Sequence, residues 1–141
     1  MKKIVYFMTI CTVIIVTMTG CNKSELDTLI VNLKQEGETF QKGEFTTYEV
    51  SLKSQQEEQV SVDDVYLYMN MEHMNHPMEG KMEKVRDGIY EIDLPLAMAG
   101  EWYVLVNVRH EGEEREIPFH VFAEGDMVMK YMQDYHADEI D

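Results

Sequence analysis

The segment 69–82 is the part of the chain whose residue types and spacing suggest chemistry. It reads MNMEHMNHPMEGKM and carries five methionines and two histidines in fourteen residues. Thioether sulfur and imidazole nitrogen together favour monovalent copper, whereas oxygen ligands favour magnesium, calcium or manganese. The segment therefore predicts a soft-metal site that takes copper. The candidate ligands are Met69, Met71, His73, Met74, His76 and Met78, with Met82 and Met98 as less certain additions.

The first twenty residues read as an export signal. Two lysines precede the apolar run 4–16, and Thr19 and Gly20 stand directly before Cys21. The run is shorter than the roughly 20 residues that a membrane-spanning helix needs. The sequence before Cys21 resembles a bacterial lipobox, although Met18 stands where that motif usually has leucine. We expect residues 1–20 to be a lipoprotein signal peptide and Cys21 to carry the lipid, on the outer face of the cytoplasmic membrane. An uncleaved N-terminal anchor is the alternative.

The charge of the chain excludes some partners. The whole chain carries a net charge of −15, and removing the two lysines of the signal leaves 10 basic residues against 27 acidic ones, or −17. Binding to nucleic acid depends on neutralising phosphates with lysine and arginine, so nucleic acid is not an expected partner. Anionic lipid headgroups are disfavoured for the same reason. The domain is expected to contact the membrane only through its lipid anchor.

The cysteine count limits the chemistry further. Cys11 lies in the signal and Cys21 at the anchor, and there are no others. The folded domain therefore has no thiol for a disulfide or a Cys-x-x-Cys site. Thioethers do not form disulfides in an oxidising compartment, which makes methionine a suitable soft ligand outside the cytoplasm.

After a short polar tether, 21–27, the chain reads as brief apolar or alternating runs separated by turns. Tyr48, Val50 and Leu52 alternate with polar residues, as in a half-buried strand. Asp87-Gly88 is a hairpin signal, and Glu111-Gly112 suggests a second hairpin that could have a longer loop. The predicted strands are 28–34, 45–53, 60–71, 81–86, 89–94, 101–110 and 114–122.

This pattern predicts an all-β fold, an immunoglobulin-like β-sandwich of about seven strands. The sandwich is expected over residues 28–123, with Trp102 in its core. The segment 124–141 is expected to be an acidic tail that contains Met and His and has some helical character. Met129, Met132 and His136 would share a helical face there and could add soft ligands. His110 and His120 are interpreted as solvent-facing residues without a site role.

The candidate ligands fall into two groups in this scheme. Met69 and Met71 would share one strand face with Val65 and Leu67, and they could equally be core residues, because methionine is an adaptable core filler. Beyond Met71, Pro77 and the glycine at position 80 indicate a loop. Such a loop on a rigid sandwich would display Met74, His76 and Met78. The connection from Pro95 to Gly100, with Met98, could approach the same edge.

Several of these features together resemble the YtkA-like domain, which is related to the FixH family. They are the Met/His loop after a strand, the Asp87-Gly88 hairpin, the Gly-x-Trp strand start at Gly100 and two closing strands, over roughly 29–122. The resemblance implies an immunoglobulin-like sandwich outside the cytoplasm. It also implies a role in copper delivery or in the assembly of copper-dependent respiratory oxidases, so that a copper-accepting protein or a respiratory oxidase is the expected partner. FixH-type proteins carry a transmembrane helix, whereas the predicted anchor here is a lipid.

Two functions from different classes follow. The first is a copper-binding lipoprotein that holds Cu(I), and Cu(II) through its histidines, for delivery or tolerance. The second is a metal-free protein-binding module that assists a membrane complex and uses the Met-rich loop as an apolar contact. An enzyme is not expected, because the sequence contains no nucleophile elbow, phosphate-binding glycine loop or His-Glu-x-x-His motif.

Overall fold

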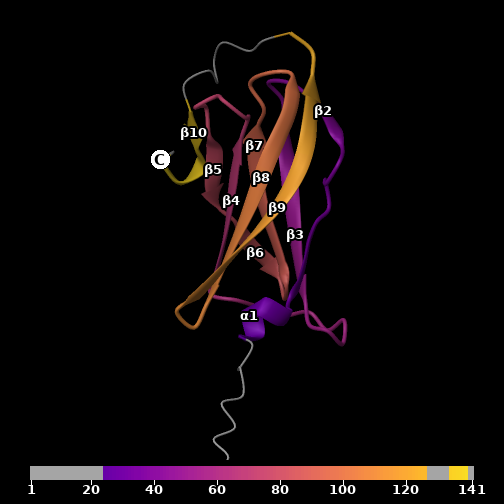
Figure 1. Ribbon diagram of the computed structural model, residues 1–141, viewed down its shortest axis with the longest axis vertical. Helices are drawn as coiled ribbons and strands as arrows, with labels where there is room; N and C mark the ends of the chain where they lie inside the picture. The colour runs from indigo at the N-terminus through magenta and orange to yellow at the C-terminus, as the bar shows by residue number, and fades with distance from the viewer. Residues whose placement is uncertain (1–23, 127–133, 140–141) are drawn as a thin grey trace, which may run out of the picture.

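Two β-sheets pack face to face in the computed structural model, which describes residues 24–126 and 134–139 (Figure 1). The smaller sheet has the strand order β1-β3-β7-β6, and the larger one β10-β5-β4-β8-β9-β2. This arrangement confirms the predicted all-β sandwich. The elements are α1 (Glu25–Thr28), β1 (Ile30–Leu33), β2 (Thr39–Gln41), β3 (Phe45–Lys53), β4 (Asp64–Asn70), β5 (Met78–Lys81), β6 (Glu83–Arg86), β7 (Ile89–Pro95), β8 (Gly100–His110), β9 (Glu113–Glu124), β10 (Tyr135–His136) and the 3-10 turn η2 (Ala137–Glu139).

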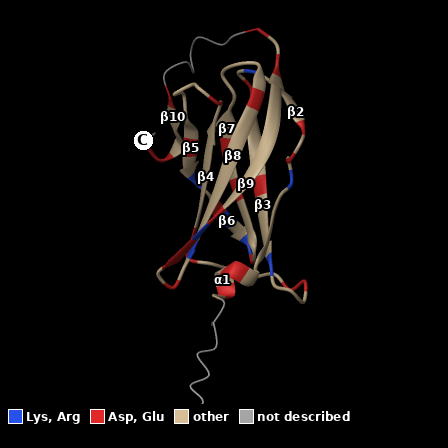
Figure 2. Cartoon of the chain, viewed as in Figure 1, with Lys and Arg blue, Asp and Glu red and all other residues tan. Residues whose placement is uncertain are grey.

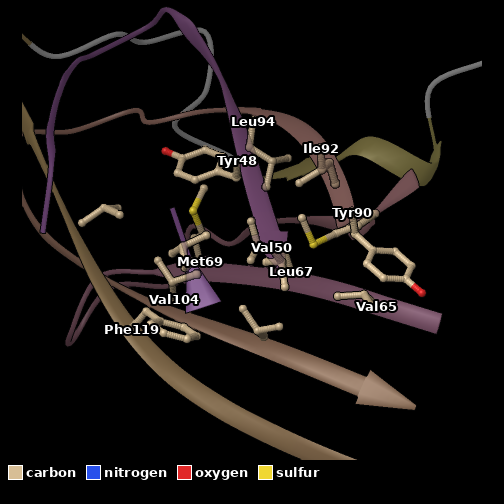
Figure 3. Packing of buried hydrophobic residues seen from close by; sticks show 14 of the residues in the cluster. Tyr48, Val50, Val65, Leu67, Met69, Tyr90, Ile92, Leu94, Val104 and Phe119 are labelled. Carbon is tan, nitrogen blue, oxygen red and sulfur yellow. The ribbon is translucent and has the colours of Figure 1, made fainter. Parts of the chain in front are cut away.

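Alternating apolar side chains of both sheets form the core. Tyr48, Val50 and Leu52 of β3 are fully buried, as the period-two pattern predicts. They face Leu67 of β4 and its neighbours across the sandwich (Figure 3). Trp102 is also fully buried, and its indole N–H donates to the carbonyl of Met98 at 3.0 Å. This hydrogen bond from a core side chain fixes the position of the connection between β7 and β8.

Both predicted hairpins are present with two-residue loops. Arg86 pairs with Ile89 around Asp87-Gly88, and His110 pairs with Glu113 around Glu111-Gly112. Glu111 and Gly112 have φ values of 51° and 82°, the positive values that a tight hairpin turn with the correct twist requires. The second hairpin therefore has the short loop and not a longer one.

The C-terminal segment 135–139, formed by β10 and η2, lies along β5; we call it the C-terminal clasp. β10 pairs with β5 in parallel, and both carboxylate oxygens of Asp138 accept from the Lys81 N–H at 2.8 and 3.0 Å. The predicted helical face is wrong for His136, which is extended in β10; Met129 and Met132 lie outside the described residues. The extended form wins because β5 offers an unpaired edge to this segment.

The N-terminal part departs from the expected tether at Ser24. The Ser24 hydroxyl caps α1 by accepting from the Leu26 N–H at 3.2 Å, and Leu26 is buried. Arg115 of β9 donates to the carbonyls of Leu26 and Leu29, each at 2.8 Å. Residues 24–28 are therefore part of the packed domain.

The sandwich has two distinct ends (Figure 1). α1 and the β8–β9 hairpin lie at one end, where the Ser24 hydroxyl donates to the Glu113 carboxylate. The β4–β5 loop, residues 71–77, and the β7–β8 connection lie at the opposite end.

No helix within the described ranges is long and apolar enough to span a membrane.

Candidate metal-binding end of the sandwich

Three of the candidate ligands are core residues. Met69 and Met78 stand opposite each other in the β4–β5 register and are fully buried, and Met82 is nearly so. The expectation that the loop displays Met78 is wrong, because β5 begins at this residue and its ladder turns the side chain inward. Met69 lies among Tyr48, Val104 and other core side chains (Figure 3). These thioethers fill the space between the sheets.

The other four candidates in this segment lie in one short loop. We call residues 71–77 the Met/His loop; it contains Met71, His73, Met74 and His76. The side chains of His73 and Met74 are exposed, the latter by 40%, and those of Met71 and His76 are half-buried. Packing gives no reason for an exposed methionine here. The structure thus gathers two thioethers and two imidazoles in one loop, where Met71 packs against the edge of the core.

Asn70 holds the two ends of the Met/His loop together. Its side-chain oxygen accepts from the N–H groups of Met71 at 2.9 Å and His76 at 3.3 Å. Its amide nitrogen donates to the Tyr68 hydroxyl at 2.9 Å. Asn70 is only 2% exposed, so these bonds are shielded from water. Asn70 was not predicted as a site residue; its one sequence signal is an asparagine where the strand alternation stops.

His76 carries an unused ligand atom. Its Nδ1 is buried and has no hydrogen-bond partner within the described part of the chain. A buried polar atom without a partner costs about 1–3 kcal/mol, and a neutral imidazole nitrogen is a common metal ligand. The chemistry of His76 therefore fits a bound metal ion. Met74 reinforces the local fold, since its N–H donates to the Met71 carbonyl at 3.3 Å.

The β7–β8 connection reaches the same edge, as expected for Met98. A Cβ atom built on Gly100 would lie 2.7 Å from the Met71 terminal carbon, so the two segments are in contact. Met98 itself is half-buried and packs against the core. It therefore lies near the Met/His loop without being part of it.

The neighbouring surface contains a cavity that the sequence analysis did not predict. It measures about 280 Å³ and is lined by Met71, Glu72, Glu101, Tyr103 and His120. His120 Nδ1 lies 3.0 Å from a carboxylate oxygen of Glu101. His120 is solvent-facing, as its alternation predicts. Its closeness to Met71 depends on the register of three strands, which no local sequence signal gives.

The pKa of Tyr103, in the lining of this cavity, is raised. Burial raises the pKa of Tyr103, and so does its hydrogen bond with Tyr68, whose ring centroid lies 6.1 Å away. No group of three or more histidine, cysteine, aspartate or glutamate side chains able to hold a metal occurs in the described ranges.

Comparison with known proteins gives one family. A family model described as YtkA-like matches residues 23–107, which is more than half of the chain. No curated protein matches. The matched segment includes the Met/His loop, Asn70 and the β7–β8 connection, and it ends inside β8.

Solved structures show the same kind of sandwich at low sequence identity. The filamin domain of Lin-41 is 14% identical with a TM-score of 0.50, and the match covers 69% of this chain and 92% of that one. An endo-β-1,4-mannanase from Thermotoga petrophila is 13% identical with a TM-score of 0.52, over 70% of this chain. An engineered protein is 10% identical with a TM-score of 0.54, over 69% of this chain. The match covers only 20% of each of the last two. These likenesses show the immunoglobulin-like fold alone.

Proposed function

Because this chain belongs to the YtkA-like family, we propose that it is a non-enzymatic, lipid-anchored extracytoplasmic module that binds Cu(I) through its Met/His loop and passes it to a partner. The observation that carries the proposal is the arrangement of this loop. Two thioethers and two imidazoles lie in this one loop, and Asn70 holds its two ends through the N–H groups of Met71 and His76. Thioether and imidazole are the ligand types that suit Cu(I).

The exposure of the loop suits exchange of the metal. Copper is here a cargo, which a recipient must be able to reach and remove. Met74 is exposed in this loop, and the buried Nδ1 of His76 has no hydrogen-bond partner among the described residues. A site built on a surface loop, with no enclosing group of charged ligands, would release its metal to a partner that supplies further ligands.

The position of the loop suits a lipid-anchored protein. Cys21 precedes Ser24 by three residues, and α1 lies at the end of the sandwich away from the Met/His loop (Figure 1). A lipid on Cys21 would therefore leave the loop facing away from the bilayer. The acidic residues, which are distributed along the chain (Figure 2), also oppose contact with anionic headgroups. The same charge attracts cations.

A metal-free contact module is the second candidate. It is favoured by the exposure of Met74, since a flexible apolar side chain on a loop can also seat against a membrane-protein partner. Replacing Met74 by leucine distinguishes the two functions. Leucine keeps the apolar contact and removes the sulfur ligand.

The test is a titration of the full-length protein in detergent with Cu(I), in competition with a chelator, read by X-ray absorption at the copper and sulfur edges. The loop variant carries His73→Asn, Met74→Leu and His76→Asn. Met69→Leu is the matched control, because it removes a thioether from the core and leaves the loop unchanged.

Tight binding with sulfur and nitrogen neighbours, retained in Met69→Leu and weakened at least tenfold in the loop variant, would support the copper carrier. Cu(I) binding no stronger than that of the chelator would overturn it. In that case, capture of a membrane partner that survives Met74→Leu would support the contact module.

A further inference from the structure

We propose that Met71 and the Nε2 nitrogen of His120 form a second soft-metal site, on the outer face of the six-stranded sheet beside the Met/His loop. Both side chains line the cavity of about 280 Å³ at this end of the sandwich. The ion bound at this site would be a monovalent soft cation, Cu(I) or its analogue Ag(I). The inference rests on the proposed function only for the identity of the natural cation.

Glu101 prepares His120 for this role. The Glu101 carboxylate lies 3.0 Å from Nδ1, where it would orient a ring that carries its hydrogen on Nδ1 and its lone pair on Nε2. Metal-binding histidines usually donate their other ring N–H to a carboxylate or carbonyl in this way, which fixes the ring and raises its basicity. Glu101 is thus a positioning residue and not a ligand.

The sheet register brings these groups to one place. Asn70 of β4 stands opposite Tyr103 of β8, and Tyr103 stands opposite His120 of β9. Met71 follows Asn70 directly, where its N–H is held by the Asn70 side chain. Asn70 therefore holds the ends of the Met/His loop and also fixes the backbone of Met71. This places Met71 next to the register row formed by Asn70, Tyr103 and His120.

Close packing below the site directs the Met71 side chain. Its terminal carbon lies where a Cβ atom on residue 100 would come within 2.7 Å, so glycine at this position gives the thioether its room. The methionine side chain has three rotatable bonds and can turn its sulfur toward the cavity. Two protein ligands would leave a coordination position open toward solvent, where a recipient could add its own ligand.

The test is NMR of the histidine ring nitrogens in the full-length protein in detergent, titrated with Ag(I), which is not redox-active. The variants are Met71→Leu, His120→Asn and Glu101→Gln, together with the loop variant that lacks His73, Met74 and His76. His110 is the internal control. It also has a carboxylate neighbour, Asp63 at 3.5 Å, but it lies at the opposite end of β8 and β9.

A shift of His120 Nε2 on adding Ag(I) is expected, in the wild type and in the loop variant. It should disappear in Met71→Leu, while Glu101→Gln should weaken the affinity about tenfold or more, as for other residues that orient a ligand. His110 should not shift at equal silver. Circular dichroism of Met71→Leu and His120→Asn checks that each variant is folded.

The outcomes separate this inference from the proposed function. Silver that perturbs His73 and His76 but not His120 would overturn the second site and leave the loop function standing. Silver that perturbs His120 but no loop histidine would support the second site and overturn the loop function. Equal shifts of His110 and His120 would show unselective binding and overturn the second site.

Discussion

The side-chain oxygen of Asn70 receives the backbone N–H of His76 at 3.3 Å, and in this way the last strand residue of β4 ties down the far end of the loop that follows it. The same oxygen also accepts from Met71. A buried amide with these bonds sets where the loop leaves the sheet and where it returns. The candidate ligands owe their placement to a residue that is not itself a soft ligand.

Asn70→Ala is expected to lower the free energy of unfolding by about 1–3 kcal/mol, because two backbone N–H groups and the Tyr68 hydroxyl lose a shielded partner. It should also weaken Cu(I) binding although no ligand is removed. Urea denaturation and the chelator competition measure the two effects. Asn75→Ala, an exposed change in the same loop, is the control and should alter stability by less than about 0.5 kcal/mol. Equal effects of the two substitutions would contradict the role of Asn70.

Met69 should behave as a core residue in stability and as a bystander in metal binding. Met69→Ala is expected to cost about 2–5 kcal/mol through the cavity it leaves, and Met69→Leu less than about 1.5 kcal/mol. Met74→Ala, at the exposed loop position, should be close to neutral for stability. Thermal unfolding of the metal-free protein gives all three values. A neutral Met69→Ala would show that this side chain is not packed as described.

Gly80→Ala is expected to loosen the C-terminal clasp. A Cβ atom there would come within 2.7 Å of the Ala137 Cβ and 2.8 Å of the Ile92 Cδ1, which forces the clasp or the core to shift at a cost of about 1–3 kcal/mol. Hydrogen exchange of the Tyr135 N–H, which bonds the Pro77 carbonyl at 2.9 Å, should accelerate. The double variant with Ala137→Gly relieves one of the two contacts and should recover part of the loss. An unchanged exchange rate of the Tyr135 N–H would mean that Ala137 does not pack closely against Gly80.

Alkaline pH should reveal the environment of Tyr66. Burial first, and then the charges of Glu79 and Asp138, raise its pKa to about 12. The folded state therefore holds its phenolic proton more tightly than the unfolded chain, whose tyrosine pKa is about 10. This contribution to stability is complete below pH 10 and is lost as the pH rises toward 12. Phenolate absorbance with and without Tyr66→Phe measures the step, and Asp138→Asn should move it to lower pH. A Tyr66 step near pH 10 in the folded protein would contradict this reading.

Strands whose apolar and polar residues alternate strongly were predictable from the sequence. Short strands that exist only through pairing with another strand were not. β3 was predicted with its observed bounds because Tyr48, Val50 and Leu52 alternate without interruption. β2 has three residues and exists through its parallel pairing with the end of β9. Most of β5 was predicted to be part of a loop because Pro77 precedes it and Gly80 lies within it, yet pairing with β4 outweighs that local signal.

The candidate site shows the same division. The composition of the Met/His loop was sufficient to predict where soft ligands gather. It could not separate Met74, which is exposed, from Met78, which pairs opposite Met69 four residues later and is buried. The pairing of His120 with Glu101, and their position beside Met71, follow from strand register across β4, β8 and β9. Register is set by the whole fold, so local sequence carries little of it.

The covering of β5 by β10 has a consequence for how many copies can share a membrane. An uncovered β5 edge would offer its backbone groups to any identical neighbour, and lipid-anchored molecules meet far more often in two dimensions than free ones do in solution. With Tyr135 and His136 paired along it, Met78 and Glu79 of β5 are not available to another chain, and the two-residue strand β10 is the edge that remains on this side of the larger sheet. On the membrane anchor proposed above, so short an edge would give a neighbouring copy little backbone to pair with on this side, and the Met/His loop would stay open to a partner.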